Sequence, residues 1–437
     1  MKALRLRAHY SVADFFVFVA LFCVSTFALL EHASISVPMF SQVKFPLLIV
    51  GGVALLTQFK LIINTIFKKK YFFVMLLLLF FFLMLSISML VNRNLNFGFS
   101  TVRNTSRLML YLFELFVLMM VLAETGRGKK TLDFLFKYLL MLAVVTDVFL
   151  LTGLVTFRSG RFESYLIGSK FSVAYLHMNL LGIWVVRMQR KKQDVHMPRW
   201  LILVLSLLII WVSIRVNCMT GVLGCVMLVI LMLMIRRSES RRGGLFTSPV
   251  ILLLLLAGSV VFSLVAEEIV SIPFVRDFVE DVLSRDVTLT GRLQIFFEYA
   301  DKLQGRWLNG FGYGNGNVAA VRLFGYENAQ NGLLQWVLQV GILSTSAMIL
   351  WMLQIFRQAN RLGQKRSMEI MPLVALIYVY IAIGTAETSF DMCFLMWFGL
   401  LFMLSSEKEW EQTDAENHED PSSIVVHKRR KVVFRWR

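Results

Sequence analysis

Charged residues and cysteines are both scarce in this chain. Only 17% of its 437 residues are Asp, Glu, Lys or Arg, whereas 57% are hydrophobic. This composition argues against an ordinary soluble domain, whose residues are nearer half apolar. The four cysteines are scattered without metal-ligand spacing, and three of them lie inside apolar runs. The pattern supports neither a disulfide framework nor a zinc site, and we interpret the cysteines as small packing residues.

The apolar residues are grouped in blocks of about 15 to 25 residues. A helix rises about 1.5 Å per residue, so such a block matches the roughly 30 Å hydrocarbon layer of a bilayer. A soluble helix would interrupt the run with a polar face. We therefore predict an all-α polytopic membrane protein and no soluble globular domain.

About twelve transmembrane helices are expected from these blocks. The stretch 200–235 would span about 54 Å as a single helix, which is too long for one crossing. We therefore predict a hairpin that turns near Arg215, Asn217 and Thr220. The first block follows a basic leader but precedes no small-residue cleavage site, so we interpret it as a retained span. The predicted spans are 11–30, 45–64, 71–91, 107–124, 132–156, 168–187, 200–214, 219–235, 248–266, 329–356, 370–387 and 391–405.

Basic clusters occupy alternate connections between the blocks. Placing them on the cytosolic side leaves both termini cytosolic, as the positive-inside rule predicts for a multi-pass protein of the bacterial plasma (inner) membrane. The net charge of +17 is then mostly a consequence of topology, and we expect no nucleic-acid partner. The clusters lie at 68–70, 127–130, 190–192, 236–242, 357–366 and 428–437.

Two segments are expected to leave the bundle. We assign residues 1–406 to a transmembrane helical bundle, in which 267–328 forms a large extracytoplasmic loop domain between the ninth and tenth spans. Residues 407–437 form a cytosolic basic tail that we expect to be disordered, with its basic end near anionic lipid.

The external connections hold many more Arg than Lys residues. Membrane orientation needs only positive charge, whereas the guanidinium fork matches phosphate and carboxylate geometry. This preference predicts an external site for an anionic, phosphorylated ligand. The alternative is that these Arg bind lipid headgroups or pair with nearby acids, as Arg161 could with Glu163. Arg215 is the strongest candidate because it lies in an apolar hairpin without an adjacent acid.

Four segments resemble one known family. They are T-G-R-L-Q-I-F-F-E-Y (290–299), W-L-N-G-F-G-Y-G-N-G (307–316), E-N-A-Q-N-G-L-L-Q-W-V-L-Q-V-G-I-L (327–343) and R-V-N-C-M-T-G-V-L-G (215–224). In their order and spacing they resemble the signature region of the bacterial O-antigen polymerase and O-antigen ligase superfamily. In that family an Arg opens a loop helix, a Gly-rich turn follows, and a His-Asn pair begins the next span.

The resemblance implies a glycosyltransferase that acts on the outer face of the membrane. Its donor would be an undecaprenyl-diphosphate-linked oligosaccharide, whose anomeric carbon is attacked by a sugar hydroxyl of the acceptor. Carried over by position, Arg215 and Arg292 would contact the pyrophosphate, which Arg can do without a metal. The resemblance thus implies a metal-independent enzyme without a cofactor. A chain-length regulator is a further expected partner.

Gln330 and Asn331 fall where ligases of the family place His-Asn. Gln330 cannot act as a general base, and its presence favours a polymerase over a ligase. Glu327 is the nearest alternative base, with Glu387 and Asp391 behind it. We therefore assign catalytic roles to Arg215, Arg292, Gln330, Asn331 and Glu327.

A second set of residues is assigned to substrate binding. The Gly-rich segment 310–316 is either a phosphate-binding nest of N–H groups or a tight turn at the membrane surface. Tyr313 and Trp307 could stack on sugar rings or anchor the protein at the interface. The substrate-binding candidates are Arg161, Arg306, Arg322, Tyr313 and Asn315.

The function predicted here is polymerisation of O antigen, capsule or exopolysaccharide. A glycan ligase of the same family is the first alternative, because it differs only in its acceptor. A lipid-linked saccharide transporter or flippase is the second. Against a transporter, the two halves show no internal repeat and few ionisable residues lie at mid-span, with Glu114, Lys137 and Asp147 as the exceptions.

Overall fold

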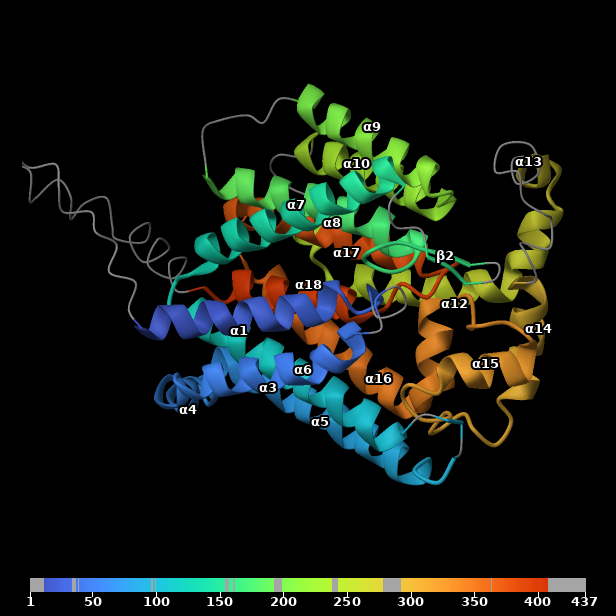
Figure 1. Cartoon of the computed structure of the whole chain (residues 1–437), viewed down its shortest axis with the longest axis horizontal. Helices are drawn as coiled ribbons and strands as arrows, with labels where there is room; N and C mark the ends of the chain where they lie inside the picture. The colour runs from blue at the N-terminus through green and yellow to red at the C-terminus, as the bar shows by residue number, and fades with distance from the viewer. Residues whose placement is uncertain are drawn as a thin grey trace, which may run out of the picture.

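The computed structural model is a bundle of helices with one short two-stranded hairpin (Figure 1). Helices dominate because the long apolar runs can satisfy their backbone N–H and C=O groups inside lipid only by internal hydrogen bonds. The structure describes residues 12–33, 37, 39–95, 97–98, 100–153, 157–159, 162–191, 199–237, 243–277, 292–362 and 364–407.

The elements follow one another along the chain in a nearly all-helical order. The helices are α1 (Val12–Leu29), α3 (Met39–Leu56), α4 (Phe59–Ile66), α5 (Lys69–Val91), α6 (Thr101–Glu124), α7 (Gly128–Thr152), α8 (Lys170–Lys191), α9 (Arg199–Arg215), α10 (Met219–Arg237), α11 (Gly243–Phe246), α12 (Pro249–Ser271), α13 (Pro273–Asp277), α14 (Arg292–Lys302), α15 (Gly316–Phe324), α16 (Gly332–Asn360), α17 (Gln364–Ile383) and α18 (Met392–Ser405). Strand β1 (Phe157–Ser159) pairs antiparallel with β2 (Phe162–Ser164).

Within the described ranges, seven helices are long and apolar enough to cross a membrane, and five shorter helices are also apolar. Each of these coincides with one predicted span, so the helical class and the apolar helices are confirmed. The full number of crossings stays a prediction. The predicted span 45–64 differs in detail, because α3 runs from Met39 to Leu56 and the chain then turns into the separate helix α4.

Large apolar side chains cover the outside of the bundle. Phe73 of α5 is 51% exposed, Leu207 of α9 is 65% exposed and Leu254 of α12 is 60% exposed. An outer surface of this kind would be costly in water but is suited to lipid. The four cysteines are buried and unpaired, in agreement with their interpretation as packing residues.

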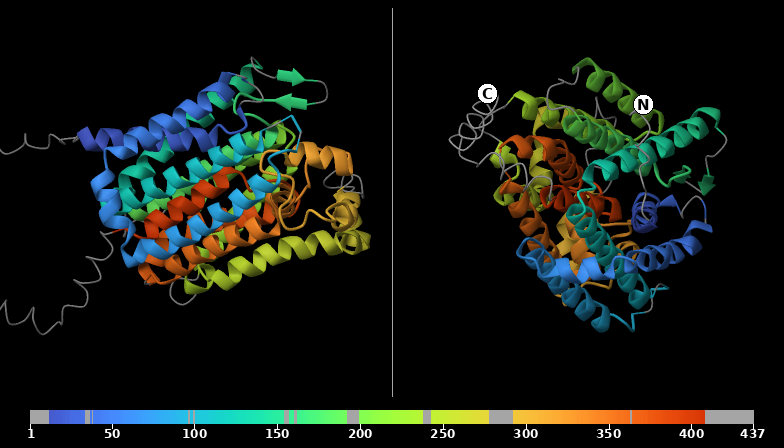
Figure 2. Two further views of the ribbon diagram at one scale, coloured as in Figure 1. Left: turned by 90° about the horizontal axis from the view of Figure 1, so that it is seen from below. Right: turned by 90° about the vertical axis from the view of Figure 1, so that its left-hand side faces the viewer.

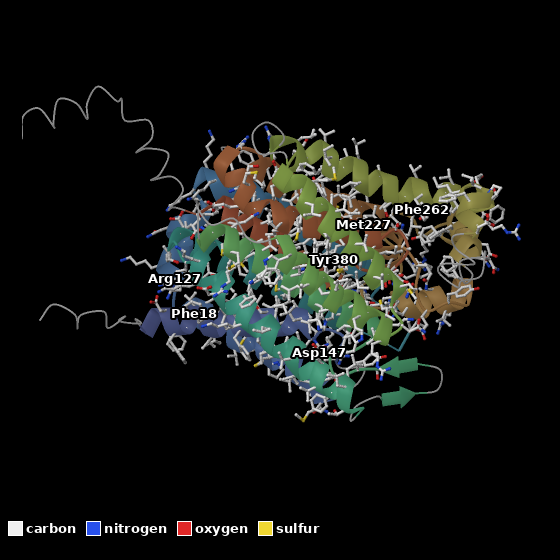
Figure 3. The ribbon with its side chains drawn as sticks, turned by 90° about the horizontal axis from the view of Figure 1, so that it is seen from above. Phe18, Arg127, Asp147, Met227, Phe262 and Tyr380 are labelled. Atoms are coloured by element: carbon white, nitrogen blue, oxygen red, sulfur yellow. The ribbon has the colours of Figure 1, made fainter. Side chains whose placement is uncertain are left out.

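Basic residues from distant parts of the chain gather at one end of the bundle around buried carboxylates. The Glu124 side chain is fully buried and lies 2.6 Å from Lys68 Nζ. Likewise Glu407 is fully buried and lies 2.6 Å from Arg190 Nη2. Arg127, which pairs with Asp14, is visible at this end in Figure 3. Clusters that were predicted to share one side of the membrane therefore share one end of the fold.

The opposite end carries the β hairpin and the short helices α14 and α15 (Figure 2). The described part of the predicted loop domain, residues 292–328, encloses a second, smaller hydrophobic cluster. This cluster joins α14 and α15 to the adjoining ends of α12 and α16. Its members include Ala266, Ile295, Phe296, Tyr299, Leu303, Ala319, Ala320, Phe324, Val337 and Leu338.

The Gly-rich segment docks against a break in α16. Gly341 lies inside α16 with φ 78° and ψ 172°, so the helical hydrogen bonds are interrupted there. The N–H of Phe311 donates to Leu338 O at 2.9 Å, and the N–H of Gly312 donates to Gln339 O at 2.7 Å. These N–H groups are used inside the fold, which favours the tight-turn interpretation of the segment over the phosphate nest.

Replacing Gly341 by Ala is expected to destabilise the fold. A Cβ at this position would lie 2.1 Å from Leu308 O, and φ is positive. Backbone strain of this kind costs roughly 1–3 kcal/mol before the clash is added. The melting temperature of the detergent-extracted protein should fall. Gly258→Ala is the matched control, because nothing lies within 4 Å of the added Cβ. Equal melting temperatures for the two variants would contradict the expectation.

Candidate functional site

A cavity of about 1310 Å³ enters the bundle from the end that carries the loops. It is larger than the roughly 300–1,000 Å³ of a typical small-molecule pocket. Its walls come from the end of α1, the first turns of α8 and α10, the segment before α16, and the connection between α17 and α18. Because helix ends and connections form it, polar side chains and backbone groups are concentrated there.

The cavity brings together three of the four segments that carry the family resemblance. Residues 216–220 of the α9–α10 turn line it, as do Phe296 of α14 and residues 325–328 with Gln330. The structure thus places the predicted residues Glu327 and Gln330 in the lining. The first and last of these segments are more than 100 residues apart in the sequence. Only the packing of the bundle brings them together.

Two lining residues have strained backbone conformations. Asn217 and Gln330 each have φ 54°, and they are the non-glycine residues with positive φ in the described ranges. The N–H of Gln330 donates to Asn328 Oδ1 at 2.9 Å. A left-handed conformation is uncommon outside glycine and is concentrated at functional sites. Both strained residues face the same cavity, which marks it as the candidate site.

The predicted pyrophosphate-binding arginines stand at the edge of this site. Arg215 is exposed and ends α9, directly before the lining residue Val216, and it does not line the cavity itself. Arg292 begins α14, four residues before Phe296, and its side chain lies outside the described part of the structure. Arg161 also lies outside the described residues. The roles assigned to these arginines stay predictions.

The other predicted substrate contacts surround the Gly-rich segment and do not line the cavity. Arg306 Nη1 donates to Asn92 Oδ1 at 3.1 Å. The guanidinium of Arg322 lies 4.4 Å from the centroid of the Phe97 ring. These contacts hold the loop in place in the fold described here.

Tyr313 and Asn315 are likewise engaged inside the protein. The ring centroid of Tyr313 lies 5.8 Å from that of Trp336, and burial raises the pKa of Tyr313. Asn315 is fully buried, and its Nδ2 donates to Thr101 Oγ1 at 2.9 Å. Neither residue lines the cavity.

Asn331 joins two helices below the cavity. Its Oδ1 caps α16 by accepting from the N–H of Leu333 at 2.9 Å and of Leu334 at 3.0 Å. Its Nδ2 donates to Ser259 Oγ at 3.1 Å and to Ser263 Oγ at 3.0 Å, both on α12. The side chain is fully buried. These contacts fix the start of α16 directly after Gln330, and the catalytic role assigned to Asn331 stays a prediction.

Five residues of the Asp, Glu, Lys and His types line the cavity. Glu327, Glu387 and Asp391 were candidate bases from the sequence, whereas Lys170 was assigned no role there. His32 was missed by the sequence analysis. The available signal was a Glu-His pair placed directly after the first apolar block.

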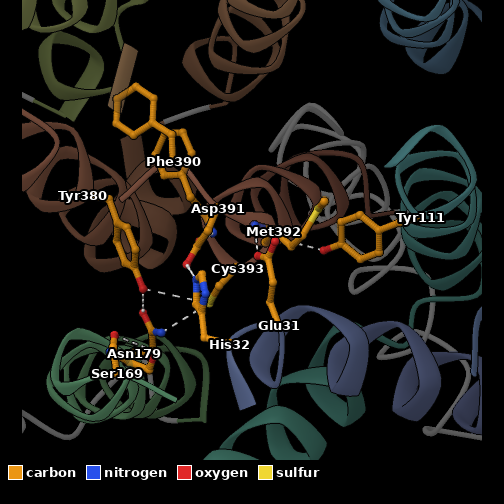
Figure 4. Close-up of polar contacts among 12 residues, drawn as sticks. Glu31, His32, Tyr111, Ser169, Asn179, Tyr380, Phe390, Asp391, Met392 and Cys393 are labelled. Carbon is orange, nitrogen blue, oxygen red and sulfur yellow. Dashed lines mark hydrogen bonds and ion pairs between the residues drawn. The ribbon is translucent and has the colours of Figure 1, made fainter. Parts of the chain in front are cut away.

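Glu31, His32 and Asp391 form a compact polar cluster at the wall of the cavity (Figure 4). His32 Nε2 lies 3.5 Å from Asp391 Oδ2, and Glu31 Oε2 accepts from the N–H of Met392 at 2.9 Å. The donor atoms of the three residues lie within 4.8 Å of one another, close enough for one cation to reach. Lys44 donates to Glu31 O beside them, so we interpret the group as a hydrogen-bonded ion-pair cluster.

Another part of the cavity lining is a buried network of uncharged side chains. Tyr380 O–H donates to Asn179 Oδ1 at 3.0 Å, and Asn179 Nδ2 donates to Cys393 Sγ at 3.3 Å. The ring of Tyr175 meets that of Tyr380 edge to face, with centroids 5.6 Å apart. Aromatic and amide groups of this kind suit a ligand with both polar and apolar faces.

No family model matches the chain, and no curated protein or solved structure matches it. The resemblance to the O-antigen polymerase and ligase superfamily therefore stays a prediction based on the motifs and their placement.

Replacing Asn331 by Ala is expected to destabilise the protein by about 1 to 2 kcal/mol, because the α16 cap and the donors to α12 are both lost. The melting temperature should fall, and activity should fall only with the amount of folded protein. Asn64→Ala on the exposed face of α4 is the control. A variant that melts like the natural protein yet is inactive would instead give Asn331 a direct catalytic role.

Proposed function

We propose that this protein is a polysaccharide polymerase, a glycosyltransferase that joins undecaprenyl-diphosphate-linked oligosaccharide units at the outer face of the bacterial plasma membrane. The observation that carries the proposal is the shared cavity. It is lined by the hairpin turn 216–220, by Phe296 of α14 and by residues 325–328 with Gln330, and three of the segments that carry the resemblance meet there.

The size and lining of the cavity support an oligosaccharide substrate. Its volume of about 1310 Å³ leaves room for parts of both a donor and an acceptor. Aromatic rings from Tyr175, Phe262, Phe296 and Tyr326 stand among its polar residues. Such mixed walls can meet both the apolar ring faces and the hydroxyl groups of sugars.

The cations near the hairpin turn suit the donor diphosphate. Lys170 lines the cavity together with this turn and with the carboxylate of Glu387. Burial raises the pKa of Cys218 in the turn, the charge of Glu387 raises it further, and the charge of Lys170 lowers it. Arg215 stands at the rim of the same turn. In the proposed reaction an acceptor hydroxyl attacks the anomeric carbon, the bond to the phosphate oxygen breaks, and the leaving diphosphate keeps the electron pair. Cations stabilise that developing charge.

The placement of charge favours an enzyme over a flippase. Lys170 begins α8, Asp391 caps α18, and Glu387 lies in the connection between α17 and α18. The ionisable residues of the cavity therefore stand at helix ends, on the side of the loops. A flippase for an anionic lipid would instead need cations along the depth of a central path.

Loss of any one of the cations Lys170, Arg215 and Arg292 is expected to shorten the surface polysaccharide. In a deletion strain, Lys170→Ala, Arg215→Ala and Arg292→Ala should give mainly single repeat units on a gel, because the diphosphate loses its partners. Lys302→Ala is the control, since Lys302 is an exposed residue of α14 with only a 3.9 Å contact to Glu298. All proteins should be present at equal levels in the membrane.

The same gel separates the alternatives. Long polymer from the Lys170, Arg215 and Arg292 variants would remove these residues from the mechanism. An unchanged surface glycan in the deletion strain would contradict the polymerase proposal itself. Arg215→Lys should also impair the enzyme, because Lys keeps the charge but loses the planar fork.

A further inference from the structure

His32 stands at the wall of the cavity, directly after α1, with its side chain 43% exposed toward the open space. Its position is fixed from two sides. Asp391 approaches its Nε2 atom at 3.5 Å. On the other side, a Cβ at Gly168 would lie only 2.6 Å from His32 Cβ, so the backbone around Gly168 packs directly on this residue.

Asp391 is itself held by the helix that it caps. Its Oδ1 accepts from the N–H of Phe394 at 2.9 Å in the first turn of α18, which leaves Oδ2 directed to His32. Glu31 Oε2 accepts from the N–H of Met392 in the same turn, and Met392 O accepts from Tyr111 O–H at 3.0 Å. The end of α1 and the start of α18 are thereby joined into one rigid unit (Figure 4).

The arrangement is that of an imidazole positioned by a carboxylate. Asp391 Oδ2 lies 3.5 Å from Nε2, a contact that favours the proton on Nε2 and the lone pair on Nδ1 in the neutral ring, and the structure gives no other ion-pair or hydrogen-bond partner to the His32 side chain among the described residues. Gln330, which stands where the family's ligases carry His, has no group that accepts a proton at neutral pH. Glu327 is exposed, and among the described residues no side chain forms an ion pair or hydrogen bond that would position its carboxylate.

We propose that His32 is the general base of the polymerase reaction and that Asp391 is its positioning residue, an inference that rests on the proposed function. Nδ1 of His32 takes the proton of the acceptor hydroxyl as its oxygen bonds to the anomeric carbon. The bond between that carbon and the diphosphate oxygen breaks, and the electron pair leaves with the diphosphate. The imidazolium then returns its proton to the diphosphate or to water.

The pKa of His32 is set by opposing effects of burial and of neighbouring charges. Burial lowers the pKa of His32, but the contact with Asp391 and the charges of Glu31 and Asp391 outweigh this effect, so the pKa is raised above its ordinary value. Burial raises the pKa of Glu31 as well. The charged groups around His32 are Glu31, Lys44 and Asp391 at the cluster, with Lys170, Glu327 and Glu387 elsewhere on the cavity wall. The other titratable groups of the wall are the side chains of Tyr165, Tyr175, Tyr326, Tyr380, Cys218 and Cys393.

The test uses purified full-length protein and the lipid-linked repeat units that accumulate in the deletion strain. His32→Gln keeps the size and polarity of the side chain but cannot accept the proton. We expect the rate of chain extension to fall about 100-fold, as is usual for the loss of a general base, with little change in the KM of the donor. Asp301→Asn on the exposed face of α14 is the control, and every variant must melt like the natural protein.

The pH profile distinguishes catalysis from a structural role. For the natural protein the rate should rise with pH as His32 loses its proton, and this limb should be absent in His32→Gln. In Asp391→Asn the limb should move to lower pH, because the carboxylate that raises the His32 pKa is gone. Added imidazole should partly restore His32→Ala. These changes would not follow from a loss of packing alone.

Three outcomes would overturn the proposal. The first is a rate and pH profile in His32→Gln equal to those of a natural protein that extends chains. This result would exclude His32 as the base and would leave the proposed polymerase function standing. The second is activity that stops in EDTA and returns with Mg²⁺, because the cluster would then act by binding a cation. The third is a natural protein that extends no chain at all, which overturns the proposed function together with the base.

Discussion

The structure depends on one constraint, which is that backbone N–H and C=O groups inside a hydrocarbon layer must be hydrogen-bonded within the protein. The long apolar runs therefore form helices, and the polar chemistry is moved to the helix ends. The break in α16 follows the same rule. Its interrupted carbonyls at Leu338 and Gln339 are taken up by the N–H groups of Phe311 and Gly312, so a non-helical segment is allowed only because the Gly-rich loop covers it.

The two ends of the bundle differ because of this arrangement. At one end, buried carboxylates such as Glu124 and Glu407 are neutralised by Lys and Arg from several helices, which makes a closed, structural layer. At the other end, helix termini leave an open cavity with strained residues at Asn217 and Gln330. Positive φ angles outside glycine are concentrated at functional sites, although Asn217 also lies just past the end of α9, where the N–H of Cys218 donates to Ser213 O at 2.8 Å. The closed end supports the fold, and the open end is where chemistry can occur.

In the proposed site, His32 would take the place of the His that the family's ligases carry at the position of Gln330. A motif that carries Gln330 in place of His loses its base locally. Asp391 and His32 come from opposite ends of the sequence, yet the pairing of α1 with α18 places Nε2 and Oδ2 3.5 Å apart within the lining of the same cavity. Helix packing can thus bring a proton acceptor to the site from a part of the chain that the motif does not include.

Hydropathy alone determined the helical class, the apolar helices and the grouping of basic residues, because a bilayer imposes a fixed length and a charge asymmetry that are written in consecutive residues. The motifs also indicated Glu327 and Gln330, which do line the cavity. Only the tertiary structure decided that Asn331 caps α16 and that Asn315 is buried against Thr101. It alone brought His32 to Asp391, because contacts between helices distant in sequence depend on packing angles that no local pattern records.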